Sequence, residues 1–292
     1  MTETGVRPEA GLVLTLSCPD QAGVVLAVAR FVAEQGCTIT ESQQFRDPEQ
    51  GRFFMRLRFE QVNGRTLDLP LVRSAFAAVA APLLMSWRLT RAAERQRVLI
   101  MVSRYGHCLN DLLYRASTGA LNIIVAAVVS NHPDLGAMAD SHDVPFHHVP
   151  VIPEKKAAAE ARLLELVDDL DVDLVVLARY MQVLSGELCR KLDGRAINIH
   201  HSMLPSFKGA RPYHQAHRRG VKLIGATAHY VTADLDEGPI IEQEVTRVDH
   251  SMSARQVTAI GRDNESLALS RAVQWHADNR VLLDGPRTVV FR

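Results

Sequence analysis

The stretch that decides the fold is Ala196-Ile197-Asn198-Ile199-His200-His201-Ser202-Met203-Leu204-Pro205-Ser206-Phe207. It begins as a short apolar run and continues as a loop that contains proline, which is typical of a strand that ends in a turn. Side chains alternate between the two faces of a strand, so Asn198 and His200 share one face at the strand end. We therefore expect the amide and the imidazole to point at one substrate atom together.

A carboxylate can complete this pair. Asp236 lies in the turn Leu235-Asp236-Glu237-Gly238-Pro239, just before a second apolar run, where it can be held at the rim of a sheet. An amide that donates to a developing oxyanion, an imidazole that moves a proton and a carboxylate that orients water together suit acyl transfer. Ser202 lacks the G-x-S-x-G context of a nucleophilic serine, so direct transfer to water or to an amine is favoured over a covalent intermediate. Taken singly, each residue also fits an ordinary turn or loop position.

The chain around this site alternates apolar runs with helical patterns. Strands that alternate with helices predict a Rossmann-like, mostly parallel α/β sheet covered on both faces, with a site at the carboxyl ends of its strands. The runs are Val98 to Val102, Ile123 to Val129, Leu174 to Leu177 and Ile197 to Ile199, followed by strand patterns at Leu223 to Val231 and Pro239 to Val248. A helical pattern from Ser253 to Leu283 and a strand-like run from Arg287 to Phe291 end the chain.

The first part of the chain has a different order. Its patterns read βαββαβ, with a turn at Asp47 to Gly51 between two strands, and this order predicts a ferredoxin-like antiparallel sheet with helices on one face. We therefore predict two domains, a small one over residues 8–88 and a catalytic one over residues 97–292. The charged residues 89–96 are expected to form the linker between them.

Composition excludes several classes of protein. At 292 residues and 47% hydrophobic content the chain can bury two cores, and its 33 Lys and Arg balance its 33 Asp and Glu, so it has no broad basic field for nucleic acid. The four cysteines lack C-x-x-C spacing, the start is polar, and no apolar run approaches the roughly 20 residues that cross a bilayer. We expect a cytoplasmic protein without nucleic-acid or membrane partners.

The two motifs resemble those of the formyltransferase family that uses 10-formyltetrahydrofolate, an N-I-H-x-S-x-L-P-x-F segment and a D-x-G-x-I-I segment. The resemblance implies that Asn198 donates to the formyl oxygen, that His200 is the catalytic imidazole and that Asp236 positions water and tunes the histidine. The segment Leu177 to Leu184 is similar to the family's folate-lining segment, and the structural reading, a buried parallel strand that runs into a helix, holds whether or not folate binds. The substrate-binding residues implied in this way are Arg179, Tyr180, Met181, Val183, Leu184, Ile199, Phe207 and Gly238.

The loop after the first strand of the catalytic part separates the members of that family. Where a phosphate-binding loop would be rich in glycine, this chain has Ser103-Arg104-Tyr105-Gly106-His107-Cys108-Leu109-Asn110-Asp111, although Arg104 could still bind a phosphate. Without a site for a phosphorylated amine, water is the default acceptor, and the whole chain resembles the formyltetrahydrofolate deformylases. The resemblance implies a hydrolase of one-carbon metabolism and purine biosynthesis that releases formate and tetrahydrofolate and needs no cofactor.

Two further groups of polar residues carry weaker expectations. His214 and His217 have helical i,i+3 spacing, but they lack a carboxylate or cysteine partner, and we assign no metal. Glu265, in the long helical pattern, is expected to face solvent, with a supporting role behind the site as the alternative.

The loop Cys18-Pro19-Asp20-Gln21-Ala22-Gly23-Val24-Val25 resembles the first loop of ACT domains, which often lines an amino-acid site. Asp20 and Gly23 are therefore candidate effector-binding residues; the alternative is that Asp20 caps the next helix and Gly23 permits close packing. The resemblance also implies a homo-oligomer, a dimer or tetramer, controlled by a small amino acid. Two other functions stay open, a folate-dependent amine formyltransferase that binds its acceptor at Arg211-Pro212-Tyr213, and an amino-acid or folate sensor without turnover.

Overall fold

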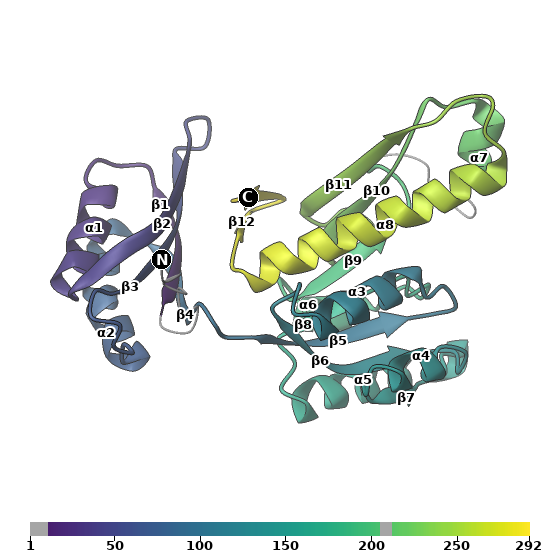
Figure 1. Cartoon of the computed structure of the whole chain (residues 1–292), viewed down its shortest axis with the longest axis horizontal. Helices are drawn as coiled ribbons and strands as arrows, with labels where there is room; N and C mark the ends of the chain where they lie inside the picture. Colours follow the sequence, from purple (N-terminus) through teal and green to yellow (C-terminus); the bar gives the residue numbers. More distant parts are fainter. Residues whose placement is uncertain (1–10, 205–211) are drawn as a thin grey trace, which may run out of the picture. The chain divides into compact units, whose positions relative to one another are not determined.

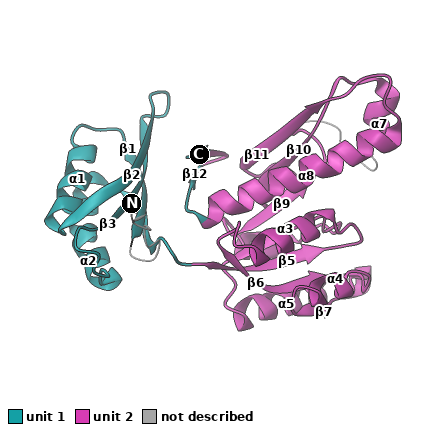
Figure 2. Ribbon diagram, in the orientation of Figure 1, with its two compact units in different colours: residues 1–94, 278–284, 289–292 teal, residues 95–277, 285–288 magenta. Residues whose placement is uncertain are grey.

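A computed structural model of the chain describes residues 11–204 and 212–292. The described residues form two compact units (Figure 2). The first unit comprises residues 11–94 together with 278–284 and 289–292, and the second comprises residues 95–277 and 285–288. Each unit has its own sheet.

The first unit has the predicted βαββαβ order and a four-stranded antiparallel sheet in the order β2-β3-β1-β4 (Figure 1). The ferredoxin-like arrangement is thus confirmed. Asp47 Oδ1 accepts from the backbone amides of Glu49 and Gln50 and so forms the predicted turn between β2 and β3. The elements are β1 (Leu12–Pro19), α1 (Val24–Glu34), β2 (Cys37–Asp47), β3 (Arg52–Gln61), α2 (Leu69–Ala80), the short 3₁₀ turn η1 (Ala81–Leu83) and β4 (Ser86–Arg91).

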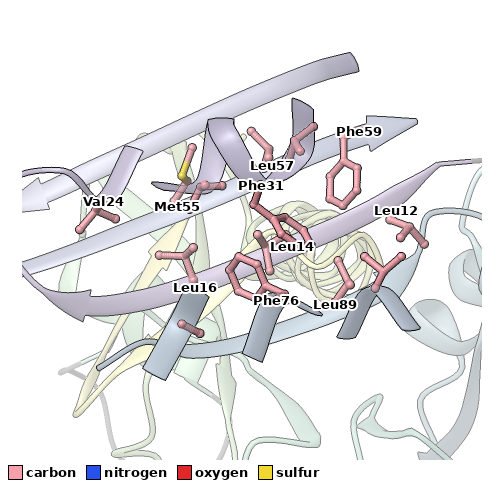
Figure 3. Close-up of a cluster of buried hydrophobic side chains, with 14 of the residues drawn as sticks. Leu12, Leu14, Leu16, Val24, Phe31, Met55, Leu57, Phe59, Phe76 and Leu89 are labelled. Atoms are coloured by element: carbon pink, nitrogen blue, oxygen red, sulfur yellow. The ribbon is translucent and has the colours of Figure 1, made fainter. Parts of the chain in front are cut away.

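The core of the first unit lies between the sheet and its two helices. Alternate side chains of β1, Leu12, Leu14 and Leu16, are buried against Phe31 of α1 and Phe76 of α2 (Figure 3). The two phenylalanine rings meet edge to face with their centroids 5.0 Å apart. The period of two in β1 therefore places one face of the sheet under both helices.

The end of the chain belongs to the first unit. Leu282 and Phe291 pack on Phe54, and Arg280 pairs with Glu41 at 3.0 Å. The helix expected to run to Leu283 is shorter, since α8 covers Ala254–Ala277 and is followed by β12 (Val281–Asp284) and then β13 (Arg287–Val290). The sequence predicted that the second domain extends to residue 292. Residues 278–284 and 289–292 instead belong to the first unit, because apolar contacts join the last strands to β3.

The second unit holds a seven-stranded sheet in the order β11-β10-β9-β8-β5-β6-β7. Strands β5 to β9 run parallel to one another, whereas β10 pairs antiparallel with both β9 and β11. The predicted mostly parallel α/β fold is therefore confirmed. The elements are β5 (Gln96–Val102), α3 (His107–Ser117), β6 (Ile123–Ser130), α4 (Gly136–Asp140), β7 (Phe146–His148), the 3₁₀ turn η2 (Pro153–Lys155), α5 (Lys156–Asp169), β8 (Leu174–Leu177), α6 (Gly186–Lys191), β9 (Ala196–His200), α7 (Pro212–Arg219), β10 (Leu223–Tyr230), β11 (Ile240–Arg247) and α8.

Helices cover the central strands of this sheet. Helices α5 and α6 contribute Leu163 and Leu188 to a core that includes Leu99 of β5 and Val175 of β8, while α8 packs along β9, β10 and β11 (Figure 1). The irregular linker is shorter than the expected residues 89–96, because β4 reaches Arg91 and β5 begins at Gln96. The carboxyl ends of the parallel strands β8 and β9 lie side by side, and ligands of open α/β sheets bind at the carboxyl ends of the strands. Among the described residues, no helix combines the length and the apolar character that a bilayer crossing requires.

Candidate active site

A cavity of about 230 Å³ opens at the carboxyl ends of β8 and β9 in the second unit. Asn198 and His200 of β9 line it, and Asp236 reaches it from the loop between β10 and β11. The alternation of side chains along β9 therefore brings both polar side chains to the same cavity, as predicted. The three candidate catalytic groups come together from two segments of the chain.

His200 is held at both ring nitrogens. Its Nδ1 lies 3.2 Å from Asp236 Oδ2, and its Nε2 lies 2.8 Å from Ser202 Oγ. The imidazole is the main reason that the pKa of Asp236 falls below its ordinary value, although partial burial opposes this shift. An ionised Asp236 favours the His200 tautomer with its proton on Nδ1, and Nε2, which faces the Ser202 hydroxyl, is then the nitrogen of the ring that can accept a proton.

Asn198 is oriented by a residue that the sequence analysis missed, His229 of β10. The two residues are direct partners in the antiparallel register of β9 and β10, and Asn198 Nδ2 lies 3.2 Å from His229 Nε2. His229 Nδ1 donates to the Tyr230 carbonyl oxygen at 2.8 Å, and burial lowers the pKa of His229. A neutral ring with its proton on Nδ1 accepts at Nε2, so Asn198 must present its nitrogen to it. The second N–H of this amide is then the donor that the site offers to a substrate oxygen.

The loop residues hold unusual backbone conformations. Asp236 has φ 59° and Arg179 has φ 67°, both in the left-handed region that non-glycine residues rarely occupy. Gly238 lies where β10 comes very close, since a Cβ there would be 1.7 Å from the Tyr230 carbonyl oxygen. Gly238, which was expected to bind substrate, therefore permits the close backbone contact with β10 in the loop that carries Asp236.

Most of the other expected substrate-binding residues lie around the same cavity. Arg179 and Ile199 form part of its wall beside the catalytic groups. The remainder of this set follows β8 and consists of Tyr180, Met181, Val183 and Leu184. The Met181 amide donates to Ser103 Oγ at 2.9 Å and so fixes the start of this segment to the end of β5. Phe207 lies outside the described residues.

The expectation that Glu265 faces solvent was wrong. Its side chain is 1% exposed and contacts His107 Nε2 and Tyr213 Oη, each at 2.7 Å, as well as Arg179. A charged side chain on a helix is usually exposed, but α3 and α7 pack on α8 at this point and contribute His107 and Tyr213. Tyr213, one of the residues expected to bind an amine acceptor, is buried and donates its hydroxyl to Glu265 rather than facing a ligand.

The residues that lie close enough to bind a metal differ from the pair His214 and His217 that the sequence suggested. His217 Nε2 lies 3.1 Å from the Met252 carbonyl oxygen. Among the described residues, His107, Cys108 and Glu265 lie close enough to hold a metal. Burial raises the pKa of the Cys108 thiol, and Glu265 is already paired with Arg179. These donors suit a hydrogen-bonded cluster better than a metal site, because a thiol ligand must be deprotonated.

The candidate effector residues lie in the first unit. Asp20 and Gly23 line a cavity with Arg46 and Phe53, and Asp20 pairs with Arg46. The alternative that Asp20 caps α1 was wrong, since the residue at the cap is Gly23 and no side chain hydrogen-bonds there. Gly23 has φ 90°, a conformation that favours glycine.

Comparison with known proteins agrees with this site. The formyl transferase family matches residues 96–273. A formyltetrahydrofolate deformylase of Corynebacterium sp. (strain P-1) is 52% identical over 96% of this chain and 98% of its own length. The crystal structure of a formyltetrahydrofolate deformylase from Burkholderia mallei superimposes with a TM-score of 0.92 at 50% identity, covering 97% of this chain and all of the other. A glycinamide ribonucleotide transformylase from Symbiobacterium toebii matches with a TM-score of 0.64 at 30% identity and covers 68% of this chain and 95% of its own.

The parallel sheet, the site at its carboxyl edge and these matches define the class of the protein. The chain belongs to the formyl transferase family and, within it, to the formyltetrahydrofolate deformylases.

Proposed function

We propose that the protein hydrolyses 10-formyltetrahydrofolate to formate and tetrahydrofolate. The observation that carries this proposal is the joined set of Asn198, His200 and Asp236 at one cavity, with an ordered amide, an imidazole and an ionised carboxylate. The curated relative of 52% identity, which is named a formyltetrahydrofolate deformylase, supports the choice of substrate. Water is then the acceptor of the formyl group.

The three groups have separate tasks in this reaction. Asp236 and His200 hold a water and accept its proton while its oxygen bonds to the formyl carbon. The second N–H of Asn198 stabilises the oxyanion that develops on the formyl oxygen. The bond between the carbon and the folate nitrogen then breaks, the nitrogen keeps the electron pair, and a proton delivered through His200 completes tetrahydrofolate. One water is consumed for each formate released.

The residues after β8 are the proposed folate-binding wall. Tyr180, Met181, Val183, Leu184 and Ile199 border the cavity. Phe207 is proposed to belong to the same set. Substitution of Val183 by Ala is expected to raise KM more than it lowers kcat, because this exposed side chain offers apolar area to a bound ring. The reaction as written uses water and side chains of the chain, so we propose no cofactor and no metal.

The test is to incubate the purified protein with 10-formyltetrahydrofolate alone and to measure formate and tetrahydrofolate over time. Equal amounts of both, without an amine or a nicotinamide nucleotide, are expected. Folate bound without turnover would favour a sensor, and turnover only after addition of an amine would favour an amine formyltransferase. The burial of Tyr213 weighs against the acceptor loop of that second alternative.

The first unit is proposed to be an ACT-like regulatory domain that binds a small amino acid. Its cavity offers the Asp20 carboxylate and the Arg46 guanidinium, which can pair with the amino and carboxylate groups of such a ligand. Titration of the common amino acids against thermal stability tests this, since a ligand that binds only the folded state raises Tm. A raised Tm that is lost in Asp20→Asn is expected; unchanged Tm and unchanged activity with all of them would contradict it.

The ACT-like character of the first unit also supports a proposal about assembly, and the cysteines support one about location. We expect a homo-oligomer, a dimer or tetramer, formed through the ACT-like units, and sedimentation of the purified protein measures this. All four cysteines are free, which agrees with a reducing cytoplasm.

A further inference from the structure

The second unit contains a buried charge that the proposed reaction does not use. Glu265 of α8 is surrounded by His107, Tyr213 and Arg179, and we refer to these four residues as the Glu265 cluster. Burial by itself would raise the pKa of Glu265, but His107, Arg179 and Tyr213 together lower it. The carboxylate is therefore ionised. A buried ion is costly to a protein unless it is fully partnered, so this cluster calls for a role.

Helix α8 is shaped to receive one of these partners. A Cβ on Gly261 would lie 2.2 Å from the Tyr213 ring, so the ring rests directly on the helix backbone. The Tyr213 hydroxyl lies 3.1 Å from the Gly261 carbonyl oxygen and 2.7 Å from Glu265 Oε1. Glu265 is thereby fixed on one side, and its Oε2 faces His107 and Arg179 on the other.

Arg179 connects the cluster to the active site. Its Nε forms an ion pair with Glu265 Oε2 at 3.2 Å, and its Nη1 contacts His201 Nδ1. The guanidinium can only donate, so His201 accepts at Nδ1, and a neutral ring then carries its proton on Nε2. The Arg179 backbone is fixed as well, because its carbonyl oxygen accepts from the Ser103 amide at 3.2 Å.

His201 in turn covers the catalytic imidazole. The His200 and His201 rings are nearly parallel, with centroids 5.0 Å apart and an interplanar angle of 14°. Asp236 and Ser202 restrain His200 within the plane of its ring, and His201 restrains it from one face. A neutral His201 also places no second positive charge beside His200 when that ring accepts a proton.

We propose that Glu265 and Arg179 are positioning residues for the hydrolysis, and that they act through His201 to hold the His200 ring in its reactive orientation. This inference rests on the proposed function for the catalytic part of its test. Displacement of a catalytic group by about 1 Å can cost on the order of 100-fold in rate, so a loosened ring would lower turnover without weakening substrate binding.

The rival role for Arg179 is contact with the folate itself. The Arg179 side chain is only 11% exposed, and its guanidinium is shared between Glu265 and His201, which favours positioning over binding. The two roles differ in kinetics. A lost substrate contact raises KM, whereas a lost positioning contact lowers kcat with little change in KM.

The test compares Glu265→Gln and Arg179→Lys with the control Arg262→Ala. Gln removes the charge but keeps the shape, and Lys keeps the charge but loses the fork that reaches both partners. Arg262 is exposed and lies over the Tyr105 ring at 5.5 Å, as Arg179 does at 5.8 Å. Within the part of the chain that the structure describes, no hydrogen bond or ion pair joins Arg262 to Glu265 or His201. We expect kcat to fall about tenfold or more in the first two variants, with KM within about threefold of the original, and the control to keep both constants.

A second readout does not depend on activity. Nitrogen-15 NMR of the histidine side chains reports the tautomer of His201, which is expected to carry its proton on Nε2 in the original protein and to become mixed in Arg179→Lys and Glu265→Gln. Tyr213→Phe removes one donor to Glu265 and serves if Glu265→Gln does not fold, as judged by thermal melting. A smaller loss of kcat is expected for this variant.

Three results would overturn the inference. These are an unchanged kcat in both folded variants, a rise in KM alone, and a His201 tautomer that does not respond to either substitution. Failure of the proposed function is a separate outcome, because the original protein would then release no formate while the NMR signal of His201 would still report the link to Arg179.

Discussion

Asn198 and His229 are direct neighbours across β9 and β10, and the amide nitrogen of the first lies 3.2 Å from Nε2 of the second. This pairing decides which end of the Asn198 amide faces the cavity. The His229 ring is itself fixed by its bond to the Tyr230 carbonyl oxygen. The orientation of the oxyanion donor is therefore set by the sheet, before any substrate binds.

Substitution of His229 by Ala removes the acceptor that orients this amide. We expect kcat to fall about 10- to 100-fold with a small change in KM, because a misplaced donor acts on the transition state. Steady-state kinetics on the folded variant check this. His229→Gln, whose side-chain oxygen can accept the same N–H, should recover part of the loss; equal activity of the Ala variant and the original would remove His229 from the mechanism.

Substitution of Asn198 by Ala deletes the donor itself. A lost oxyanion donor costs about 2.7–4 kcal/mol of barrier, so kcat should fall by about two to three orders of magnitude. Single-turnover release of formate measures the chemical step directly. Near-normal turnover in the pure, folded variant would assign the oxyanion to another group.

Substitution of Asp236 by Asn should lower turnover to a similar extent and also change stability with pH. The pKa of Asp236 is lowered, chiefly by His200, so its ionised form stabilises the folded state above the unfolded pKa, and this contribution is lost as the pH falls through the folded pKa. The difference in unfolding free energy between the original and Asp236→Asn should hold steady from pH 7 to about 5 and shrink below about 4. Denaturant melts over this range test it; a difference that grows on acidification would have the wrong sign.

Substitution of Gly238 by Ala should damage the loop that carries Asp236. The new Cβ would overlap the Tyr230 carbonyl oxygen, so the loop must move, at a cost of about 1–3 kcal/mol of stability and with a loss of kcat. The matched control is Gly186→Ala, where a Cβ meets its nearest atoms at 3.5 Å or more. If both variants melt at the same temperature, Gly238 does not constrain the loop.

The parts of this structure that could be predicted from the sequence are those with a local signal. The period of two in β9 places Asn198 and His200 on one face, and the order of apolar runs predicts the two larger sheets. His229 has the same kind of signal, since it lies in the apolar run of β10, but its importance depends on a register with β9 that no local pattern reveals.

Other features depend on contacts between distant segments. Glu265 follows a helical pattern that fits an exposed face, and its burial results from His107 and Tyr213, which lie 158 and 52 residues away. The segment that forms β12 continued the helical pattern of α8, but Leu282 packs against Phe54 of the first unit and the chain is extended there. Local propensity cannot anticipate such partners.

The most direct test of the central claim is the reaction of the protein with 10-formyltetrahydrofolate in water enriched in oxygen-18. If Asp236 and His200 direct water to the formyl carbon, each formate should gain one oxygen-18, one tetrahydrofolate should appear per formate, and no amine should be needed. Asp236→Asn should strongly lower the rate at which labelled formate forms. Formate that contains no oxygen-18, or tetrahydrofolate that appears only when an added amine becomes formylated, would contradict the account.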